Sequence, residues 1–255
     1  MKFNQAKALI TGGASGLGLS VARHIVAEGG KVCLLDVNDK AGPEMAKELG
    51  NDSCYIHTDV TSEAAVIRAV DESIEAHGEI NLVVNCAGVI GAGRVLGREA
   101  PMELSFFTHT VMINLVGSFN VAKAAADRMQ HNGPDADGQR GVIINTASVA
   151  AYEGQIGQAA YSASKSGIVG MTLPMAREFA RIGVRVMTIA PGIFWTPMVD
   201  QMPEHVQESL GASIPFPPRL GRPEEFAAVV QHITENVYLN GTTIRLDGAV
   251  RLAPK

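Results

Sequence analysis

Short apolar runs alternate with amphipathic stretches along the whole chain. Seven mostly apolar runs are typical of strands in a buried parallel sheet; they cover residues 8–11, 31–35, 53–58, 80–84, 142–146, 184–190 and 241–246. Between them, apolar residues recur at helical spacing, first up to Gly29 and then over about residues 43–49, 63–77, 106–129, 158–181, 203–210 and 224–236. This order predicts an α/β fold in a single domain, residues 1–255, with one doubly wound parallel sheet of about seven strands and helices on both faces.

A glycine-rich turn lies between the first strand and the first helix. It reads Gly12-Gly13-Ala14-Ser15-Gly16-Leu17-Gly18. A strand, such a turn and a helix form the phosphate-binding start of a βαβ unit of the Rossmann type. Gly12 permits the turn, Gly16 permits a close backbone approach, and Gly18 lets the helix pack on the strand. The sequence therefore predicts a dinucleotide site here.

Acidic residues end the second and third strands. Asp36 lies 18 residues after Gly18, near the spacing of an acid that binds the adenosine ribose. A carboxylate there repels a 2′-phosphate, and neither Val37 nor Asn38 is basic, so NAD is favoured over NADP. The alternative for Asp36 is a helix cap or a solvated acid. Asp59, after the third strand, could accept from an adenine amino group or cap the next helix.

The fourth strand and the helix after it supply further candidates. The strand ends in Asn85-Cys86-Ala87-Gly88, and small residues there leave room for a planar ring. Asn114 lies inside the predicted helix over 106–129, although asparagine is a poor helix former. It is either part of an exposed polar face or a site residue.

Tyr161 and Lys165 are four residues apart, so on a helix they share one face. A cation one turn away favours the phenolate and lowers the tyrosine pKa, which would let Tyr161 act as a general acid or base towards an alcohol or carbonyl. Ser148 follows the strand over 142–146 and could hydrogen-bond a substrate oxygen. The alternative is a helical tyrosine beside a solvated lysine.

An apolar, proline-broken segment follows the sixth strand. We interpret about residues 191–220 as a mobile flap over the substrate, and a packed loop or subunit contact as the alternative. Pro174 should kink the helix over 158–181 or be accommodated locally.

The composition excludes several classes of protein. The net charge of −5, a pI near 5.8 and scattered basic residues argue against nucleic-acid binding. No apolar run reaches the ~18 residues that span a bilayer, and the early first strand leaves no room for a signal peptide. We therefore expect a cytoplasmic protein without a membrane partner.

The cysteines and histidines show no metal-binding pattern. Cys33, Cys54 and Cys86 lie in apolar runs without a Cys-x-x-Cys pair, so we expect buried free thiols in a reducing compartment. His57 and His77 have no acidic or cysteine partner at ligand spacing, and we interpret both as ordinary polar residues. No metal site is predicted.

Taken jointly, these motifs resemble the short-chain dehydrogenase/reductase superfamily over essentially the whole chain. The motifs are Thr11-Gly12-x-x-x-Gly16-x-Gly18, Asn85-Cys86-Ala87-Gly88, Asn114, Ser148, Tyr161-x-x-x-Lys165 and Pro191-Gly192. The usual Asn-Asn-Ala-Gly reads Asn-Cys-Ala-Gly here. Within the superfamily, the stretches 140–148, 172–177, 215–221 and 244–248, with Arg251 and Pro254-Lys255, look similar to the type-2 3-hydroxyacyl-CoA dehydrogenases, also called 17β-hydroxysteroid dehydrogenase type 10. Animal members act in mitochondria behind a targeting sequence, so a chain without one suits a bacterial cytosolic homologue.

The resemblance implies a role for each site residue. Tyr161 would be the acid/base, Ser148 would hold the substrate oxygen, and Lys165 would bind the nicotinamide ribose and lower the Tyr161 pKa. Asn114 would anchor a water in the proton relay, and Gln158 would join Ser148 and Tyr161 in binding substrate. The implied cofactor-binding residues are Gly12, Ser15, Gly16, Leu17, Gly18, Asp36, Asp59, Val60, Cys86, Ala87, Gly88, Tyr161, Lys165, Phe194 and Thr196.

The resemblance also implies an activity. We expect NAD-dependent, reversible oxidation of a 3-hydroxyacyl-CoA to the 3-oxoacyl-CoA by a homotetramer. A steroid or another secondary alcohol is an alternative substrate, because apolar pockets discriminate by only ~1–3 kcal/mol per methylene. The chain could instead be a 3-oxoacyl-carrier-protein reductase, which Asp36 and the acidic pI disfavour, or a dinucleotide-binding scaffold without turnover.

Overall fold

A computed structural model describes residues 1–50, 52–196, 199 and 204–254 of the chain. Seven parallel strands form one sheet in the order β3-β2-β1-β4-β5-β6-β7. The strands are β1 (Lys7–Thr11), β2 (Lys31–Asp36), β3 (Cys54–His57), β4 (Leu82–Asn85), β5 (Gly141–Thr146), β6 (Val184–Pro191) and β7 (Thr243–Leu246). The strand order reverses direction between β1 and β4, and a crevice for a ligand is expected at that point, outside the carboxyl ends of the strands.

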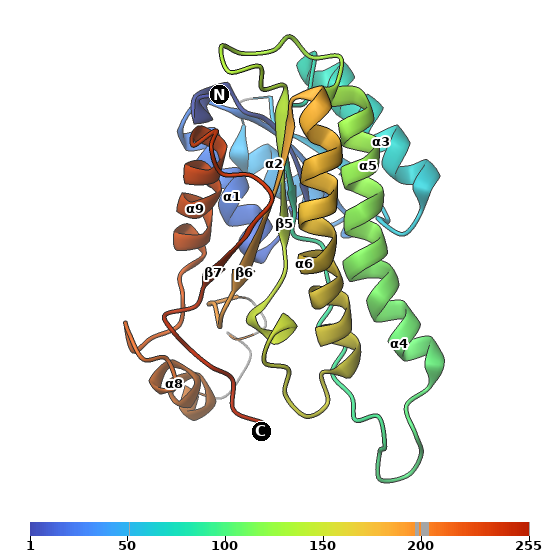
Figure 1. Ribbon diagram of the computed structural model, residues 1–255, viewed down its shortest axis with the longest axis vertical. Coiled ribbons are helices and arrows are strands. Elements are labelled where there is room, and N and C mark those ends of the chain that lie inside the picture. Colours follow the sequence, from blue (N-terminus) through green and yellow to red (C-terminus); the bar gives the residue numbers. More distant parts are fainter. Residues whose placement is uncertain (51, 197–198, 200–203, 255) are drawn as a thin grey trace.

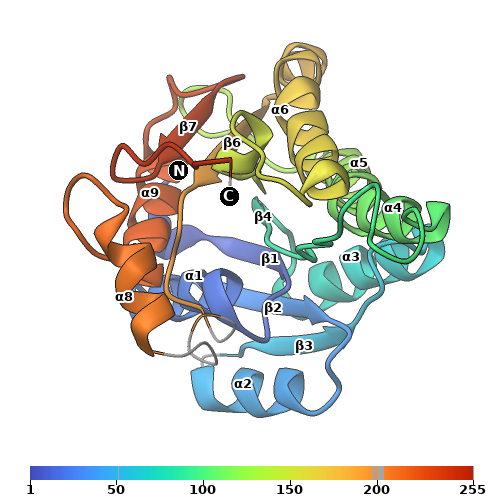
Figure 2. The same cartoon turned by 90° about the horizontal axis from the view of Figure 1, so that it is seen from below.

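Helices cover both faces of the sheet (Figures 1 and 2). They are α1 (Gly16–Ala27), α2 (Ala41–Leu49), α3 (Glu63–His77), α4 (Leu104–Val111), α5 (Gly117–Met129), α6 (Ala159–Phe179), α8 (Glu204–Ala212) and α9 (Pro223–Glu235). Successive strand residues point to opposite faces. In β1, Ile10 packs in the cluster formed with α1, α2 and α9, whereas Leu9 packs in the cluster formed with α3, α5 and α6. Because both faces are covered, the strands read as continuous apolar runs. The predicted single-domain α/β fold is confirmed.

The long helix predicted over 106–129 is three consecutive segments. A π-helical turn, Met112–Val116, separates α4 from α5, and Asn114 lies inside it. The wider π turn adds a residue within the helix, and such turns occur frequently at functional sites. The helix over 158–181 runs as α6 through Pro174 and ends in a 3-10 turn at Ala180–Ile182.

The segment after β6 is held to the fold at both of its ends. The Trp195 N–H donates to the Gly221 carbonyl at 2.8 Å, and the Gly221 N–H donates to the Ile193 carbonyl at 2.9 Å. Arg219 forms an ion pair with Glu225 of α9 at 2.7 Å. Residues 197–198 and 200–203 of the predicted flap lie outside the described residues.

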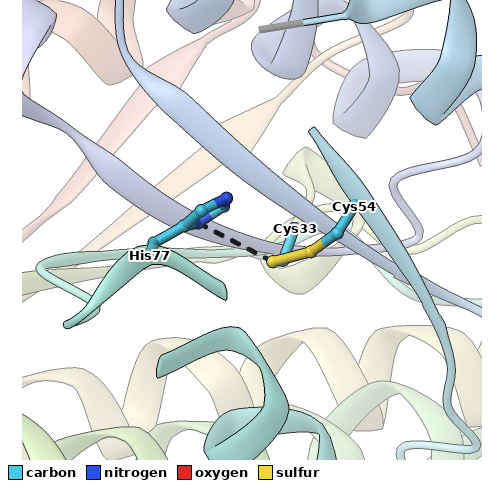
Figure 3. A group of neighbouring side chains, drawn as sticks. All are labelled: Cys33, Cys54 and His77. Atoms are coloured by element: carbon cyan, nitrogen blue, oxygen red, sulfur yellow. Dashed lines mark hydrogen bonds between the residues drawn. A yellow bond between two sulfur atoms is a disulfide. The ribbon is translucent and has the colours of Figure 1, made fainter. Parts of the chain in front are cut away.

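The expectation of three free thiols is wrong for two of them. Cys33 and Cys54 are opposite each other in the β2–β3 register and are joined by a disulfide, while Cys86 is a free thiol. Both histidines have side-chain partners that their spacing in the sequence did not indicate. His77 lies 3.8 Å from the Cys33 sulfur (Figure 3), and His57 lies 2.8 Å from an Asp39 carboxylate oxygen. The Cys33–Cys54 pair follows from the strand register, which residue spacing alone does not contain.

Among the described helices, none combines the length and the apolar character that crossing a bilayer requires.

Candidate active site

A cavity of about 670 Å³ opens where the first four strands of the sheet order end. Most of the predicted cofactor-binding residues line it: Gly12, Ser15, Gly16, Leu17, Gly18, Asp36, Asp59, Val60, Cys86, Ala87, Gly88 and Thr196. Its wall also includes Thr58 and Thr146, which the sequence reasoning did not assign. Both threonines come at carboxyl ends of strands, and that position is the signal that could have identified them.

The glycine turn packs against the end of β4 without room for side chains. A Cβ at Gly12 would lie 2.9 Å from the Ala87 nitrogen, and one at Gly18 would lie 2.4 Å from the Gly12 carbonyl oxygen. Gly12 also has a φ of +62°, which disfavours other residues. The Thr11 hydroxyl accepts from the Cys86 and Ala87 N–H groups at 3.1 Å each and fixes the two segments together. Thr11 is a further positioning residue that the sequence reasoning did not assign.

The two acids lie on the wall of the same cavity. One Asp36 carboxylate oxygen accepts from the Ala14 N–H at 3.1 Å, and the other accepts from the Asn38 N–H at 3.1 Å. The Asp59 carboxylate accepts from both the N–H and the hydroxyl of Thr61, whereas Ser62 caps α3. Asp36 is therefore tied to the glycine turn itself, and Asp59 does not cap α3.

Asn114 is fully buried, which excludes the exposed polar face. Its side-chain oxygen accepts from the Val89 N–H at 2.8 Å, and its side-chain nitrogen donates to the Val89 carbonyl at 2.9 Å. The same nitrogen contacts the Ser164 hydroxyl at 3.0 Å, and Ser164 donates to the Tyr161 carbonyl at 2.7 Å. Asn114 thus connects the loop after β4 to the first turns of α6. Ser164 was not predicted.

Ser148, Tyr161 and Lys165 come together at the end of β5. Ser148 is the residue before a short 3-10 turn, its oxygen accepts from the Ala150 N–H at 3.1 Å, and its hydroxyl is hydrogen-bonded to the Tyr161 phenol. The Lys165 ammonium lies 5.8 Å from the centre of the Tyr161 ring and donates to the Thr146 carbonyl at 2.7 Å. A Cβ at Gly88 would lie 3.6 Å from that ammonium, so this group of residues adjoins the cavity wall.

The short chain dehydrogenase family profile matches residues 6–207 of the chain. The chain belongs to the short-chain dehydrogenase family. It is 52% identical to the 3-hydroxyacyl-CoA dehydrogenase type-2 of Homo sapiens, over 97% of this chain and 95% of the relative. It is 50% identical to the 3-hydroxyacyl-CoA dehydrogenase type-2 of Drosophila melanogaster, over 99% of this chain and 100% of the relative.

A solved structure agrees with these sequence comparisons. The crystal structure of 3-hydroxyacyl-CoA dehydrogenase type-2 from Mycobacterium avium has a TM-score of 0.93 and 40% sequence identity, and the match covers 98% of this chain and 97% of that one. The predicted resemblance and fold are therefore confirmed, and the chain is an oxidoreductase of the short-chain dehydrogenase family.

The protonation of the short-chain dehydrogenase site differs from the expectation for Tyr161. Burial raises the pKa of Tyr161, and the Ser148 hydrogen bond only partly opposes this. Burial also lowers the pKa of Lys165 to about 8. In the protein alone, burial therefore outweighs any lowering of the Tyr161 pKa by Lys165, because both buried groups are shifted towards their neutral forms.

The residues present fit a dinucleotide of the kind that this family uses. The glycine turn leaves backbone exposed where a Cβ would block it, and a carboxylate that suits a ribose diol lines the same cavity. Two predicted residues lie elsewhere. Phe194 packs edge-on against Phe226 in the core, 6.4 Å between ring centres, and Gln158 bonds through its side chain to the Gln155 N–H at 3.0 Å.

Proposed function

We propose that this enzyme catalyses the NAD-dependent, reversible oxidation of a 3-hydroxyacyl-CoA to the 3-oxoacyl-CoA. The observation that carries the proposal is the arrangement of Ser148, Tyr161 and Lys165 beside the cavity that fits a dinucleotide. The names of the relatives, which are 3-hydroxyacyl-CoA dehydrogenases, support the substrate class. NAD, when bound, accepts the hydride from the carbinol carbon and brings a positively charged ring.

Tyr161 exchanges the proton of the substrate hydroxyl. Its phenol shares a hydrogen bond with Ser148, so a substrate oxygen placed between them contacts both groups. Because burial raises the pKa of Tyr161 in the protein alone, the phenol stays protonated opposite a carbonyl and needs added positive charge nearby to give up that proton and act as a base. Lys165 supplies part of that charge and is positioned by the Thr146 carbonyl.

Asn114 acts on the geometry of the site. It fixes the loop after β4 and, through Ser164, the backbone of Tyr161. We assign it the anchoring of the proton relay, consistent with its burial inside a π turn. The Asn114 carboxamide already forms hydrogen bonds with Val89 and Ser164. We therefore assign the binding of the relay water to backbone groups around Asn114.

Asp36 selects NAD over NADP. Its carboxylate lines the cavity at the end of β2, and a 2′-phosphate placed against it would meet like charge. Val37, next to it, is 61% exposed and offers no positive charge to a phosphate.

The segment over 191–220 serves as the substrate flap. Thr196 lines the cofactor cavity, and Ile193, Leu210, Ile214 and Leu220 pack with Val250 in a small apolar cluster. These apolar side chains suit a segment that covers an acyl chain, although Phe194 anchors one end of the segment in the main core.

We also propose that the enzyme is a cytoplasmic homotetramer. Large apolar side chains are exposed along α4, α5 and α6, namely Leu104, Phe106, Phe119 and Leu173. Such a patch is expected to be covered by other subunits. Light scattering coupled to size exclusion would give the mass of the assembly, and a monomer would refute this part of the proposal.

The test compares substrates and one variant. The enzyme should reduce acetoacetyl-CoA with NADH, and it should do so much faster than it reduces acetoacetyl-carrier protein with NADPH. Absence of acyl-CoA turnover together with turnover of a steroid ketone would favour the alternative substrate. Tyr161→Phe should lower kcat by at least ~100-fold and leave the NADH Kd nearly unchanged. A variant that retained turnover would refute the role of Tyr161.

A further inference from the structure

The disulfide lies at the edge of the sheet, on the adenosine side of the cofactor cavity. Cys33 pairs with Cys54 in the register between β2 and the edge strand β3. Three residues further along both strands, Asp36 pairs with His57, and Asp36 lines the cavity. The bond between the two sulfurs therefore fixes the strand that carries the proposed ribose-binding acid.

Other contacts make Asp36 sensitive to the position of β3. The Tyr55 hydroxyl of β3 lies 3.0 Å from the Asp36 carbonyl and 2.8 Å from an Asp39 carboxylate oxygen. His57 contacts the same Asp39 oxygen at 2.8 Å. The turn after β2 is thus held by side chains from β3, so a shift of β3 moves the turn and its acid.

A third side chain, His77 at the end of α3, lies beside the Cys33–Cys54 disulfide (Figure 3). Its Nε2 lies 3.0 Å from the Asp52 carbonyl oxygen, which can only accept, so Nε2 carries a proton. In the neutral ring Nδ1 then carries a lone pair, and Nδ1 faces the Cys33 sulfur at 3.8 Å.

This contact is complete only when the cysteines are reduced. In the disulfide the Cys33 sulfur has no hydrogen, so a neutral His77 faces it with one acceptor opposite another. In the dithiol, the Cys33 thiol can donate to Nδ1 or transfer its proton to it. A base held against one sulfur, and not required by the disulfide, indicates that the bond opens and closes.

We propose that Cys33 and Cys54 form a reversible dithiol–disulfide switch, with His77 as its base, that controls the affinity of the enzyme for NADH. The inference rests on the proposed function because it takes the cavity beside Asp36 as the adenosine site. The oxidised form holds β3 against β2 and binds NADH more tightly, whereas reduction loosens the edge strand and weakens binding.

The exchange partner is a low-molecular-weight disulfide or thiol of the glutathione class. Cys33 is fully buried whereas Cys54 is partly exposed, so Cys54 reacts first. Its thiolate attacks the small disulfide, and one small thiolate leaves and takes up a proton. Cys33 then gives its proton to His77, its sulfur attacks the Cys54 sulfur, and the second small thiolate leaves with the proton from His77. Two electrons and two protons pass from the dithiol to the small disulfide, which becomes two thiols.

The first experiment measures NADH binding to the full-length enzyme in both states. Protein is equilibrated with oxidised or with reduced glutathione and then divided. One portion is alkylated and its thiols are counted by mass, and the NADH Kd is obtained by fluorescence titration of the portion that is not alkylated. We expect the Kd to rise at least about fivefold on reduction, the lower end of typical couplings between sites. Cys54→Ser should show the weaker affinity under both conditions, although it retains Cys86.

The outcomes separate the switch from the proposed function. Equal NADH affinity of the two states, or a thiol count that glutathione cannot change, overturns the switch. A response that persists in Cys54→Ser assigns the effect to a remaining single thiol, Cys33 or Cys86, and also overturns the switch. Absence of NADH binding in both states refutes the proposed function instead.

The second experiment tests the base. His77→Gln places an amide nitrogen where it can still donate to the Asp52 carbonyl but removes the basic nitrogen beside Cys33. Disulfide formation with oxidised glutathione should become at least ~10-fold slower, in keeping with general-base contributions. His77→Asn, which places an amide near the position of Nδ1, serves as the matched comparison for packing and should be equally slow. Wild-type rates in both variants would refute the role of His77.

Discussion

Replacing Gly18 with alanine tests the dinucleotide turn at its tightest contact. The new Cβ would lie 2.4 Å from the Gly12 carbonyl oxygen, about 0.6 Å inside the 3.0 Å limit below which Cβ contacts essentially never occur. Gly12 has little room to move away, because even a Cβ on it would lie 2.9 Å from the backbone of Cys86 and Ala87. The turn must therefore deform, and with it the backbone that would hold the phosphates.

The magnitude follows from two opposing contributions. Overpacking a tight site costs about 1–3 kcal/mol, whereas exchanging glycine for alanine within a helix gains roughly 0.5–1 kcal/mol. Gly18 lies in α1, so both contributions apply. We expect a net loss of about 1–2 kcal/mol in the free energy of unfolding. The NADH Kd should rise at least tenfold, about 1.4 kcal/mol, because the deformation falls on the binding surface.

Gly170→Ala provides the matched control. Gly170 also lies in a helix, α6, and a Cβ added there would meet no atom within 4 Å. This variant should keep or gain stability and bind NADH normally. Urea denaturation gives the free energy of unfolding, and fluorescence titration gives the Kd. If Gly18→Ala behaved like Gly170→Ala in both measurements, the close approach of α1 to the Gly12 carbonyl would be refuted.

Three further substitutions provide tests, and a fourth serves as the control for the last of them. Lys165→Met removes a buried ammonium whose pKa burial lowers to about 8 from 10.5. Since the unfolded chain holds the extra proton between these two pH values, wild-type stability should rise as the pH increases from 8 to 10.5. The variant should lack that rise and be more stable at pH 7 by up to about 3 kcal/mol, and equal urea midpoints at both pH values would contradict this. Asp36→Asn should lower the ratio of NADH to NADPH kcat/KM at least tenfold, about 1.4 kcal/mol, and an unchanged ratio would remove Asp36 from cofactor selection. Arg245→Met breaks a two-pronged pairing with Glu153 at 2.8 and 3.1 Å and should cost about 1–2 kcal/mol of stability by urea unfolding. Arg251→Met, with 60% of its side chain exposed, should cost less than about 0.5 kcal/mol, and equal losses would be inconsistent with this reasoning.

The fold could be predicted from the sequence because its signals are local. Apolar runs and helical periodicity depend on near neighbours, so all seven strands occur within a few residues of their expected bounds. Gly18, Asp36 and Tyr161 could be predicted for the same reason, since each occupies a fixed offset from a strand or helix end. The cavity then brings the glycine turn and Asp36 together as expected.

Features set by register or solvation could not be predicted. The Cys33–Cys54 pair joins residues 21 apart and depends on which rungs of β2 and β3 face each other. The π turn around Asn114 changes the helix by one residue, which periodicity cannot resolve over so short a span. The Tyr161 pKa depends on burial, which opposes the cation expected to lower it. Phe194 has the right position in the sequence, but its ring packs on α9.

The backbone hydrogen bonds of Ile193 and Trp195 with Gly221 set the proposed substrate-binding segment apart from the residues proposed for cofactor binding and catalysis. The segment between Trp195 and Gly221 starts and ends at the same place on the sheet. Its loop-closure free energy therefore rises by only about 0.6 kcal/mol for each doubling of its length. Apart from Thr196, the residues that line the nucleotide pocket lie outside that segment, and so do Ser148, Tyr161 and Lys165. Insertions or substitutions in this one segment can therefore change the substrate preference during evolution while the residues proposed for catalysis stay the same.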